Sequence, residues 1–325
     1  MDGLTQSLDA FGPWDWACVV VNLLAAFIGI YALKCWQNLP GKLTGATNSV
    51  SDAVLGLCTG LLAFGILFGV VTQLVAQSCA TYFGISQAHI FTAAFSGQLA
   101  AACAMLGMSA VAPRTLDWAP SVETDEPKIE GSHFVETDEP KSAGTPFRQA
   151  IRGFSVPRGL LALLSIFALG LAASLVWKGF HVAWEQFAVR GWAGPPPADE
   201  PQEIVNAVLK TDVDSWRFFT ITLAVTIGAP IMEELAFRGM IYPGLSRLAA
   251  ALSERPTRWI AICITGAVFS AAHLSPSAAL PLFAFGAFMC LVRDRYGLLT
   301  CMAVHCSFNA WNLVWLKLAP NASTL

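Results

Sequence analysis

The sequence predicts an all-α membrane protein, a polytopic membrane helical bundle of about eight transmembrane helices. Of its 325 residues, 55% are hydrophobic and only 13% are charged, about half the charged fraction of an ordinary soluble domain. The charges are also segregated, so that apolar runs of roughly 20 residues, the length that crosses a bilayer, alternate with short charged connections. The lipid bilayer is therefore the first expected partner, and we expect an integral multi-pass membrane protein.

The apolar runs define the predicted spans in order. The first, Trp14 to Tyr31, follows an acidic start and lacks the basic region and cleavage site of a signal peptide, so we predict a retained helix. Most lysines and arginines fall on one side of the alternating helices, and the positive-inside rule then places both termini outside. The predicted spans cover residues 14–34, 53–76, 88–112, 159–181, 218–247, 258–274, 277–292 and 297–317.

The chain is predicted to have three parts. Residues 1–112 form an N-terminal three-helix transmembrane region, and residues 159–325 form a C-terminal transmembrane region. Between them, residues 113–158 are acidic and poor in apolar side chains, which predicts a disordered polar linker. This linker contains the heptapeptide VETDEPK twice, at 122–128 and 135–141. A partner-docking role for the duplication is the alternative interpretation.

Two smaller features concern packing. The segment EIVNAVLKTDVDSW at 203–216 has apolar residues at helical spacing, which predicts an amphipathic helix at the membrane interface. The second span contains two glycine pairs, Gly56 with Gly60 and Gly65 with Gly69. Such pairs let a neighbouring helix approach closely.

Composition excludes some functions. The net charge is −3 and no basic stripe occurs, so nucleic acid is not an expected partner. The nine cysteines include no C-x-x-C pair, which argues against a disulfide framework or a zinc knuckle. Nothing in the sequence predicts an oligomeric state.

Ionisable residues inside apolar spans usually mark a functional interior surface, because burying them in a bilayer is unfavourable. The fifth span contains Glu233, Glu234 and Arg238. Glu234 and Arg238 are four residues apart and share a helix face. The side chain of Glu233 points about 100° around the helix axis from that of Glu234. One carboxylate can therefore be neutralised by arginine while its neighbour faces a different cavity.

The sixth and eighth spans supply further polar groups. Phe269 and His273 share one face of the sixth span, and His305 and Asn309 share one face of the eighth. At about 1.5 Å per residue, Glu233 and His273 lie roughly 20 Å from the cytosolic side, and His305 about 15 Å. The three helices can present these groups to one cavity if the fifth helix continues through Pro230 and Gly239. A proton acceptor, two imidazoles and an amide are the groups that activate water and stabilise an oxyanion.

The three blocks EELAFR, FSAAH and HCSFN occur in this order on successive apolar helices. They resemble the E-E-x-x-x-R, F-x-x-x-H and H-x-x-x-N motifs of the CPBP family, which includes the type II CAAX prenyl endopeptidases and bacterial Abi-like proteins. The resemblance covers about residues 205–318. It implies an intramembrane endopeptidase, a CAAX prenyl protease-like hydrolase of the metalloprotease class, with a protein or peptide substrate.

The resemblance also implies roles for the site residues. Glu233 would activate water with help from His273, while His305 and Asn309 would bind the oxyanion. Glu234 and Arg238 would hold the helix and orient the site. A divalent metal such as zinc, held by Glu233, His273 and His305, would suit zinc's ligand preference, and a metal-free glutamate mechanism stays open.

Two other functions stay open at this stage. A non-proteolytic scaffold, chaperone or immunity protein of the same family would not need Glu233. A proton-coupled transporter would use the carboxylates and histidines as a relay, although the chain shows no repeat between its halves. The resemblance places the protein in the inner membrane of a bacterium or in the endoplasmic reticulum of a eukaryote.

Overall fold

The computed structural model describes residues 12–34, 50–83, 90–111, 116, 155–192, 194, 203–213, 215–252 and 258–319. These residues contain helices and turns and no strand, which confirms the all-α prediction. The N-terminal helices are α2 (Pro13–Lys34), α3 (Val50–Leu62), η1 (Ala63–Leu67), α4 (Phe68–Phe83), α5 (Ile90–Val111) and α7 (Val156–Val189). The later helices are α8 (Glu203–Leu209), α9 (Trp216–Leu223), η3 (Ala224–Gly228), α10 (Ala229–Glu233), η4 (Glu234–Ile241), α11 (Tyr242–Leu252), α12 (Arg258–Ala272), η5 (Pro276–Ala278), α13 (Ala279–Tyr296) and α14 (Leu298–Leu318).

Five helices of the described chain are long and apolar enough to cross a membrane. They begin at Pro13, Val50, Thr92, Val156 and Trp216. The other three predicted spans are also helical, but a count of eight spans is not confirmed. Helix α12 has 15 residues, α13 has three charged residues in a row near its end, and α14 contains a histidine and two asparagines. The chain is thus a membrane helical bundle in which the last three helices are shorter or more polar.

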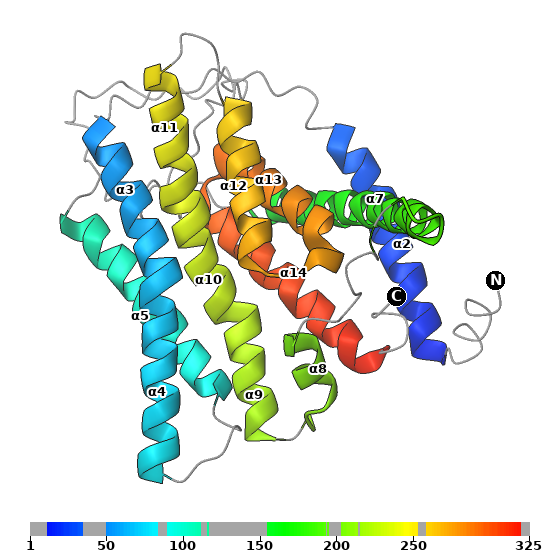
Figure 1. Ribbon diagram of the computed structural model, residues 1–325, viewed down its shortest axis with the longest axis horizontal. Coiled ribbons are helices and arrows are strands. Elements are labelled where there is room, and N and C mark those ends of the chain that lie inside the picture. The colour runs from blue at the N-terminus through cyan, green and yellow to red at the C-terminus, as the bar shows by residue number, and fades with distance from the viewer. Residues whose placement is uncertain are drawn as a thin grey trace, which may run out of the picture.

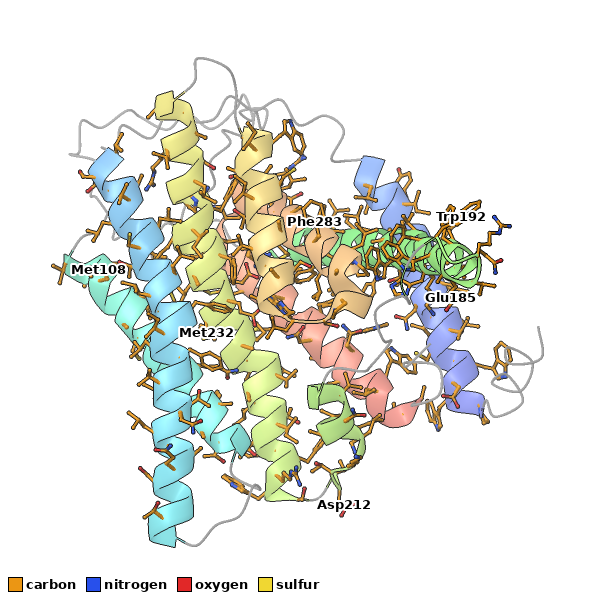
Figure 2. The ribbon with its side chains drawn as sticks, viewed as in Figure 1. Met108, Glu185, Trp192, Asp212, Met232 and Phe283 are labelled. Atoms are coloured by element: carbon orange, nitrogen blue, oxygen red, sulfur yellow. The ribbon has the colours of Figure 1, made fainter. Side chains whose placement is uncertain are left out.

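In Figure 1, the long rods of the bundle run roughly alongside one another, α5 and α14 run diagonally to them, and α7 crosses them steeply. The continuous rod α3–η1–α4 lies beside the rod α9–η3–α10–η4–α11, and α12 lies next to α11. Helix α7 is seen nearly along its axis in the same view, so it crosses the others steeply, and it packs against α2, α13 and α14. Glu185 and Trp192 at the end of α7 project away from the bundle, whereas Met232 lies within it (Figure 2).

One buried core joins these helices. Its buried members come from η1, α5, α7, α10, η4, α12, α13 and α14, and they include Met232, Phe237, Met289 and Leu298. Leu116, inside the segment predicted as a polar linker, is also buried in this core, 3% exposed. The VETDEPK duplication lies outside the described residues.

The glycine pairs of the second span differ from each other. A Cβ on Gly60 would lie 3.2 Å from the carbonyl oxygen of Ala236, so the absence of a side chain lets α3 approach η4 closely. A Cβ on Gly65 or Gly69 would meet no neighbouring atom of the described residues within 4 Å, so this pair makes no close helix contact there. The close-approach prediction thus holds at Gly60, and not at Gly65 or Gly69.

The short helix α8 packs on the bundle. Val208 is 2% exposed and lies in a cluster with Ile221 of α9 and Leu313 of α14. The ammonium group of Lys317 donates hydrogen bonds to the carbonyl oxygens of Leu209 and Thr211, at and directly after the end of α8. The segment is amphipathic as predicted, but its apolar face contacts protein.

Candidate active site

Glu233, Glu234 and Arg238 lie on one continuous helix that runs from Trp216 to Ala251. It begins at Ser215, whose hydroxyl accepts the N–H of Phe218. The helix widens into π geometry at Ala224–Gly228, which ends two residues before Pro230, and again at Glu234–Ile241. A π segment lets a helix absorb a residue that lacks an N–H, and such segments are frequent at functional sites. The predicted continuation through Pro230 and Gly239 is therefore confirmed.

Glu234 is the centre of a fully buried polar network. Its Oε1 accepts a hydrogen bond from Nη1 of Arg238 at 3.0 Å and lies 2.7 Å from Nδ1 of His305. Arg238 also donates from Nη2 to the carbonyl oxygen of Gly286 at 3.1 Å, and its guanidinium lies 4.6 Å from the ring centre of Phe269. Both Glu234 and Arg238 are 0% exposed. The pair therefore joins η4 to α12, α13 and α14.

Glu233 points to a different environment from Glu234. Its Oε2 lies 3.9 Å from Nε2 of His305, too far for a hydrogen bond, and it has no hydrogen-bond partner among the described residues. Glu233 is about 9% exposed and lines the cavity described below. The two adjacent carboxylates thus have the divergent surroundings that their helical positions predict.

His305 lies between the two carboxylates. Because a carboxylate only accepts hydrogen bonds, the contact with Glu234 places a proton on Nδ1 of His305. In the neutral ring, Nε2 is then an acceptor, and it faces Glu233. Phe285 packs against the same ring with centroids 4.8 Å apart.

His273 comes directly after α12 and faces the cavity. Its Nδ1 lies 2.8 Å from the carbonyl oxygen of Phe269, so this nitrogen donates and Nε2 is left as an acceptor. The ring of Phe269 lies 4.6 Å from that of His273 and 6.2 Å from that of His305. Phe269 is 1% exposed and forms a wall between the two histidines and Arg238.

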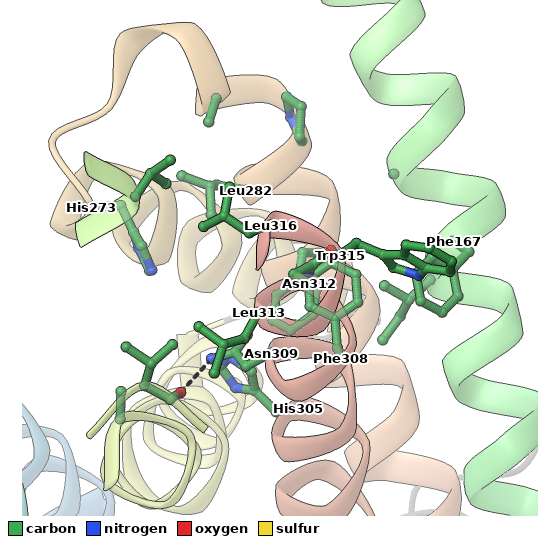
Figure 3. A pocket seen from close by; sticks show the side chains of 18 of the residues that line it. Phe167, His273, Leu282, His305, Phe308, Asn309, Asn312, Leu313, Trp315 and Leu316 are labelled. Atoms are coloured by element: carbon green, nitrogen blue, oxygen red, sulfur yellow. Dashed lines mark hydrogen bonds between the residues drawn. The ribbon is translucent and has the colours of Figure 1, made fainter. Parts of the chain in front are cut away.

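Asn309 lies one turn beyond His305. Its Nδ2 donates to the carbonyl oxygen of Val225 in the first π segment, at 2.9 Å (Figure 3). This contact is the helix-to-helix hydrogen bond that a buried asparagine commonly makes. A carboxamide nitrogen carries two hydrogens, so a second one is available for another acceptor.

A cavity of about 770 Å³ collects these groups. Glu233, His273, His305 and Asn309 line it, together with apolar side chains such as Phe285 and Leu313. Figure 3 shows the two histidines and Asn309 around this space, with Phe167 of α7 beside α14. Glu234 and Arg238 do not line the cavity and lie behind it.

The N-terminal helices contribute to the same cavity, which the sequence did not indicate. Its lining includes Cys18 and Asn22 of α2, Gln98 of α5, and Gly170 and Ser174 of α7. Asn22 is fixed by the indole nitrogen of Trp311, which donates to its Oδ1 at 2.8 Å. The sequence feature that could have predicted Asn22 and Gln98 as cavity residues is the presence of an amide side chain in an otherwise apolar helix.

The three residues implied for a metal are not gathered into one metal-binding group in this arrangement. Among the described residues, no group of three or more histidine, cysteine or acidic side chains is placed to hold a metal ion. Nδ1 of His305 is engaged by Glu234 and Nδ1 of His273 by a backbone carbonyl, which leaves Nε2 of each ring as the nitrogen that a metal would use. The metal set of Glu233, His273 and His305 therefore stays a prediction from resemblance, and the mechanism proposed for the site does not use it.

The fold and the site define a polytopic α-helical membrane protein with a buried glutamate–histidine centre that opens into an apolar cavity. Residues 215–311 match the family described as type II CAAX prenyl endopeptidase Rce1-like, which confirms the resemblance to the CPBP family for this segment. Comparison with curated proteins and with solved structures gave no match. The matched segment contains all six candidate site residues, whereas α2, α5 and α7 lie outside it.

Proposed function

We propose that this protein is an intramembrane endopeptidase that hydrolyses a peptide bond of a membrane-associated protein, including substrates of the prenylated CAAX type. The observation that carries the proposal is the position of Glu233. Glu233 lines the cavity and its Oε2 has no hydrogen-bond partner among the described residues, while Oε1 of its neighbour Glu234 is engaged by both Arg238 and His305. A carboxylate in this position can accept a proton from a water molecule in the cavity.

The first chemical step is attack of that water on the scissile carbonyl. Glu233 takes one proton as the water oxygen bonds to the carbonyl carbon, and the carbonyl π electrons move to oxygen. The second hydrogen of the water is accepted by Nε2 of His305, which lies 3.9 Å from Oε2 of Glu233, or by Nε2 of His273, which lines the same cavity, and this contact holds the water in line. Proton transfer to a positioned base accelerates such reactions by about 10²–10⁴-fold.

The tetrahedral oxyanion then needs hydrogen-bond donors. The second amide hydrogen of Asn309 is the available donor on α14, one turn from His305. When the intermediate collapses, the C–N bond breaks, and the proton held by Glu233 passes to the leaving nitrogen. The products are a new carboxyl terminus and a new amine, and Glu233 returns to its ionised form.

Glu234 and Arg238 act as positioning residues. They do not reach the cavity, but Glu234 fixes the ring orientation and the proton of His305. Arg238 compensates the buried charge of Glu234 and connects it to the backbone of α13. A buried charge pair with this many contacts maintains geometry better than a single pair would.

The test is a comparison of the wild type with Glu233→Gln, which keeps the size of the side chain. Both proteins are purified in detergent, checked for equal thermal unfolding, and incubated with a library of membrane peptides whose products are identified by mass spectrometry. The proposal expects products from the wild type alone. Equal behaviour of two folded proteins with no product from either would overturn it and favour a non-proteolytic scaffold.

A further inference from the structure

Gln98 of α5 is a buried polar residue that the mechanism above does not use. It is 6% exposed, it lines the active-site cavity together with Glu233, and its Oε1 has no hydrogen-bond partner among the described residues. Buried side-chain carbonyls nearly always have a partner, so an unsatisfied one on a residue that lines a cavity indicates a group that a ligand completes when the carboxamide turns toward the cavity. Gln98 lies outside the segment that matches the protease family.

The packing of α5 fixes the direction of this side chain. At the preceding residue, Gly97, a Cβ would lie 2.8 Å from the carbonyl oxygen of Phe68, so α5 lies very close to α4 there. The next side chain points about 100° around the helix. It meets η3, where a Cβ on Gly228 would overlap Oε1 of Gln98. The absence of side chains at Gly97 and Gly228 therefore makes the room for the carboxamide.

The distance from Gln98 to the proposed catalytic centre follows from the helix that both contact. Gly228 precedes Glu233 by five residues on one continuous helix. At 1.5 Å per residue, the two residues are about 8 Å apart along the helix axis. An extended peptide advances about 3.3 Å per residue. A substrate whose scissile bond lies at Glu233 would therefore have a backbone N–H about two residues away at the level of Gln98.

We propose that Gln98 is a substrate-positioning residue whose side-chain carbonyl accepts a hydrogen bond from a backbone N–H of the peptide, about two residues from the scissile bond. This inference rests on the proposed function. Because the contact is with the backbone, it sets the register of an extended peptide without selecting a side chain. The cavity lining is largely apolar, so its few polar side chains, Gln98 among them, are the groups that can fix the orientation of a peptide.

The experiment combines a variant of Gln98 with a change in the substrate. In a cleaved peptide, each amide near the scissile bond is replaced in turn by an ester, which removes the N–H donor with little change of shape. Gln98→Met keeps the length of the side chain and removes the acceptor. Gln73→Met, at an exposed glutamine of the neighbouring α4, is the matched control.

For the wild type and Gln73→Met, we expect the ester at one position to raise KM by about tenfold or more, with a smaller change in kcat. Gln98→Met should show that higher KM already with the all-amide peptide and should be insensitive to the same ester. A merely structural role would lower stability and would not remove this specific sensitivity. If Gln98→Met does not fold, Gln98→Asn is compared with the wild type in the same way. Its side chain is one methylene shorter, so the carbonyl oxygen no longer reaches the peptide.

Two results would overturn the inference. The first is a wild type whose KM is insensitive to every ester outside the scissile bond. The second is a Gln98 variant that keeps both the wild-type KM and the ester sensitivity. In either case, cleavage that still depends on Glu233 would leave the proposed function intact. Absence of Glu233-dependent cleavage by the wild type would instead overturn the proposed function, and this inference with it.

Discussion

Nδ1 of His305 lies 2.7 Å from Oε1 of Glu234, across the boundary between α14 and η4. This contact joins two residues that are 71 positions apart in the sequence. It fixes the imidazole so that its other nitrogen, Nε2, faces Glu233. The carboxylate that anchors the histidine and the carboxylate proposed to activate water are thus adjacent residues with separate tasks.

His305→Asn should separate the anchoring role of His305 from its catalytic role. An asparagine carboxamide can replace the Nδ1 donor toward Glu234 but offers nothing at the position of Nε2. We expect His305→Asn to unfold closer to the wild type than His305→Ala, and both to lose cleavage by about 10²-fold or more. Thermal unfolding in detergent and peptide cleavage measure the two effects. Substantial cleavage by the folded asparagine variant would contradict the assignment.

Glu234→Gln should destabilise the protein far more than Glu233→Gln. It leaves Arg238 charged and buried without its counter-ion, a change that typically costs about 3–5 kcal/mol. Glu233 makes no such pair with an arginine of the described chain, so its amide variant should unfold near the wild-type temperature. Glu185→Gln, at an exposed position on α7, is the control for removing a negative charge. Equal unfolding temperatures for the Glu234 and Glu185 variants would show that the pair does not stabilise the fold.

His273→Ala should lower the rate with little effect on stability. The residue is partly exposed to the cavity and its Nδ1 bond is made to the carbonyl of its own preceding turn. We expect kcat to fall by about 10²-fold because the water loses a positioning partner. Steady-state cleavage and thermal unfolding of the same preparation separate the two effects. An unchanged kcat would remove His273 from the mechanism.

Asn309→Leu should reduce both stability and rate, by different amounts. Loss of the hydrogen bond to Val225 should lower the free energy of unfolding by about 1 kcal/mol. Loss of an oxyanion donor should lower kcat by about 10²–10³-fold with little change in KM. Asn312→Leu, at another asparagine that lines the cavity, is the matched control. A small loss of stability with normal kcat would reduce Asn309 to a structural residue.

Chelation should leave cleavage unchanged. Of the three side chains implied as ligands, Glu233 and His305 have donor atoms 3.9 Å apart, but no third acidic or histidine side chain of the described residues completes a metal set with them. The rate of peptide cleavage is measured before and after prolonged exposure to a strong chelator. Loss of activity that zinc restores would mean that the donor set rearranges around a metal.

The candidate site was largely predictable from sequence, because its spacing rules are local to each helix. Glu234 and Arg238 share a face at four residues apart and form the expected ion pair. The approximate depths of Glu233, His273 and His305 from the cytosolic side placed them near one level, and all three line one cavity. This prediction required the fifth helix to continue through Pro230. The helix does continue, and a π segment precedes the proline.

The contribution of the N-terminal helices was not predictable in the same way. Helical periodicity tells which residues share a face, but not which other helix that face meets. Gln98 lies on α5, which packs closely on α4 at Gly97, and Asn22 of α2 is bonded to Trp311 of α14. These placements depend on contacts between segments far apart in the chain. For the same reason, the packing of α8 against α9 and α14 could not be predicted from its amphipathic pattern.

The most direct test of the proposed chemistry is cleavage in liposomes in water enriched in ¹⁸O. The wild type and Glu233→Gln are reconstituted and given membrane peptides with and without a prenylated CAAX-type terminus, and the products are analysed by mass spectrometry. We expect the wild type to release a fragment with one ¹⁸O atom in its new carboxyl group, and the variant to do so at least about 10²-fold more slowly. Absence of any labelled product from the folded wild type, or equal rates for the two proteins, would contradict the claim that Glu233 activates water for peptide hydrolysis.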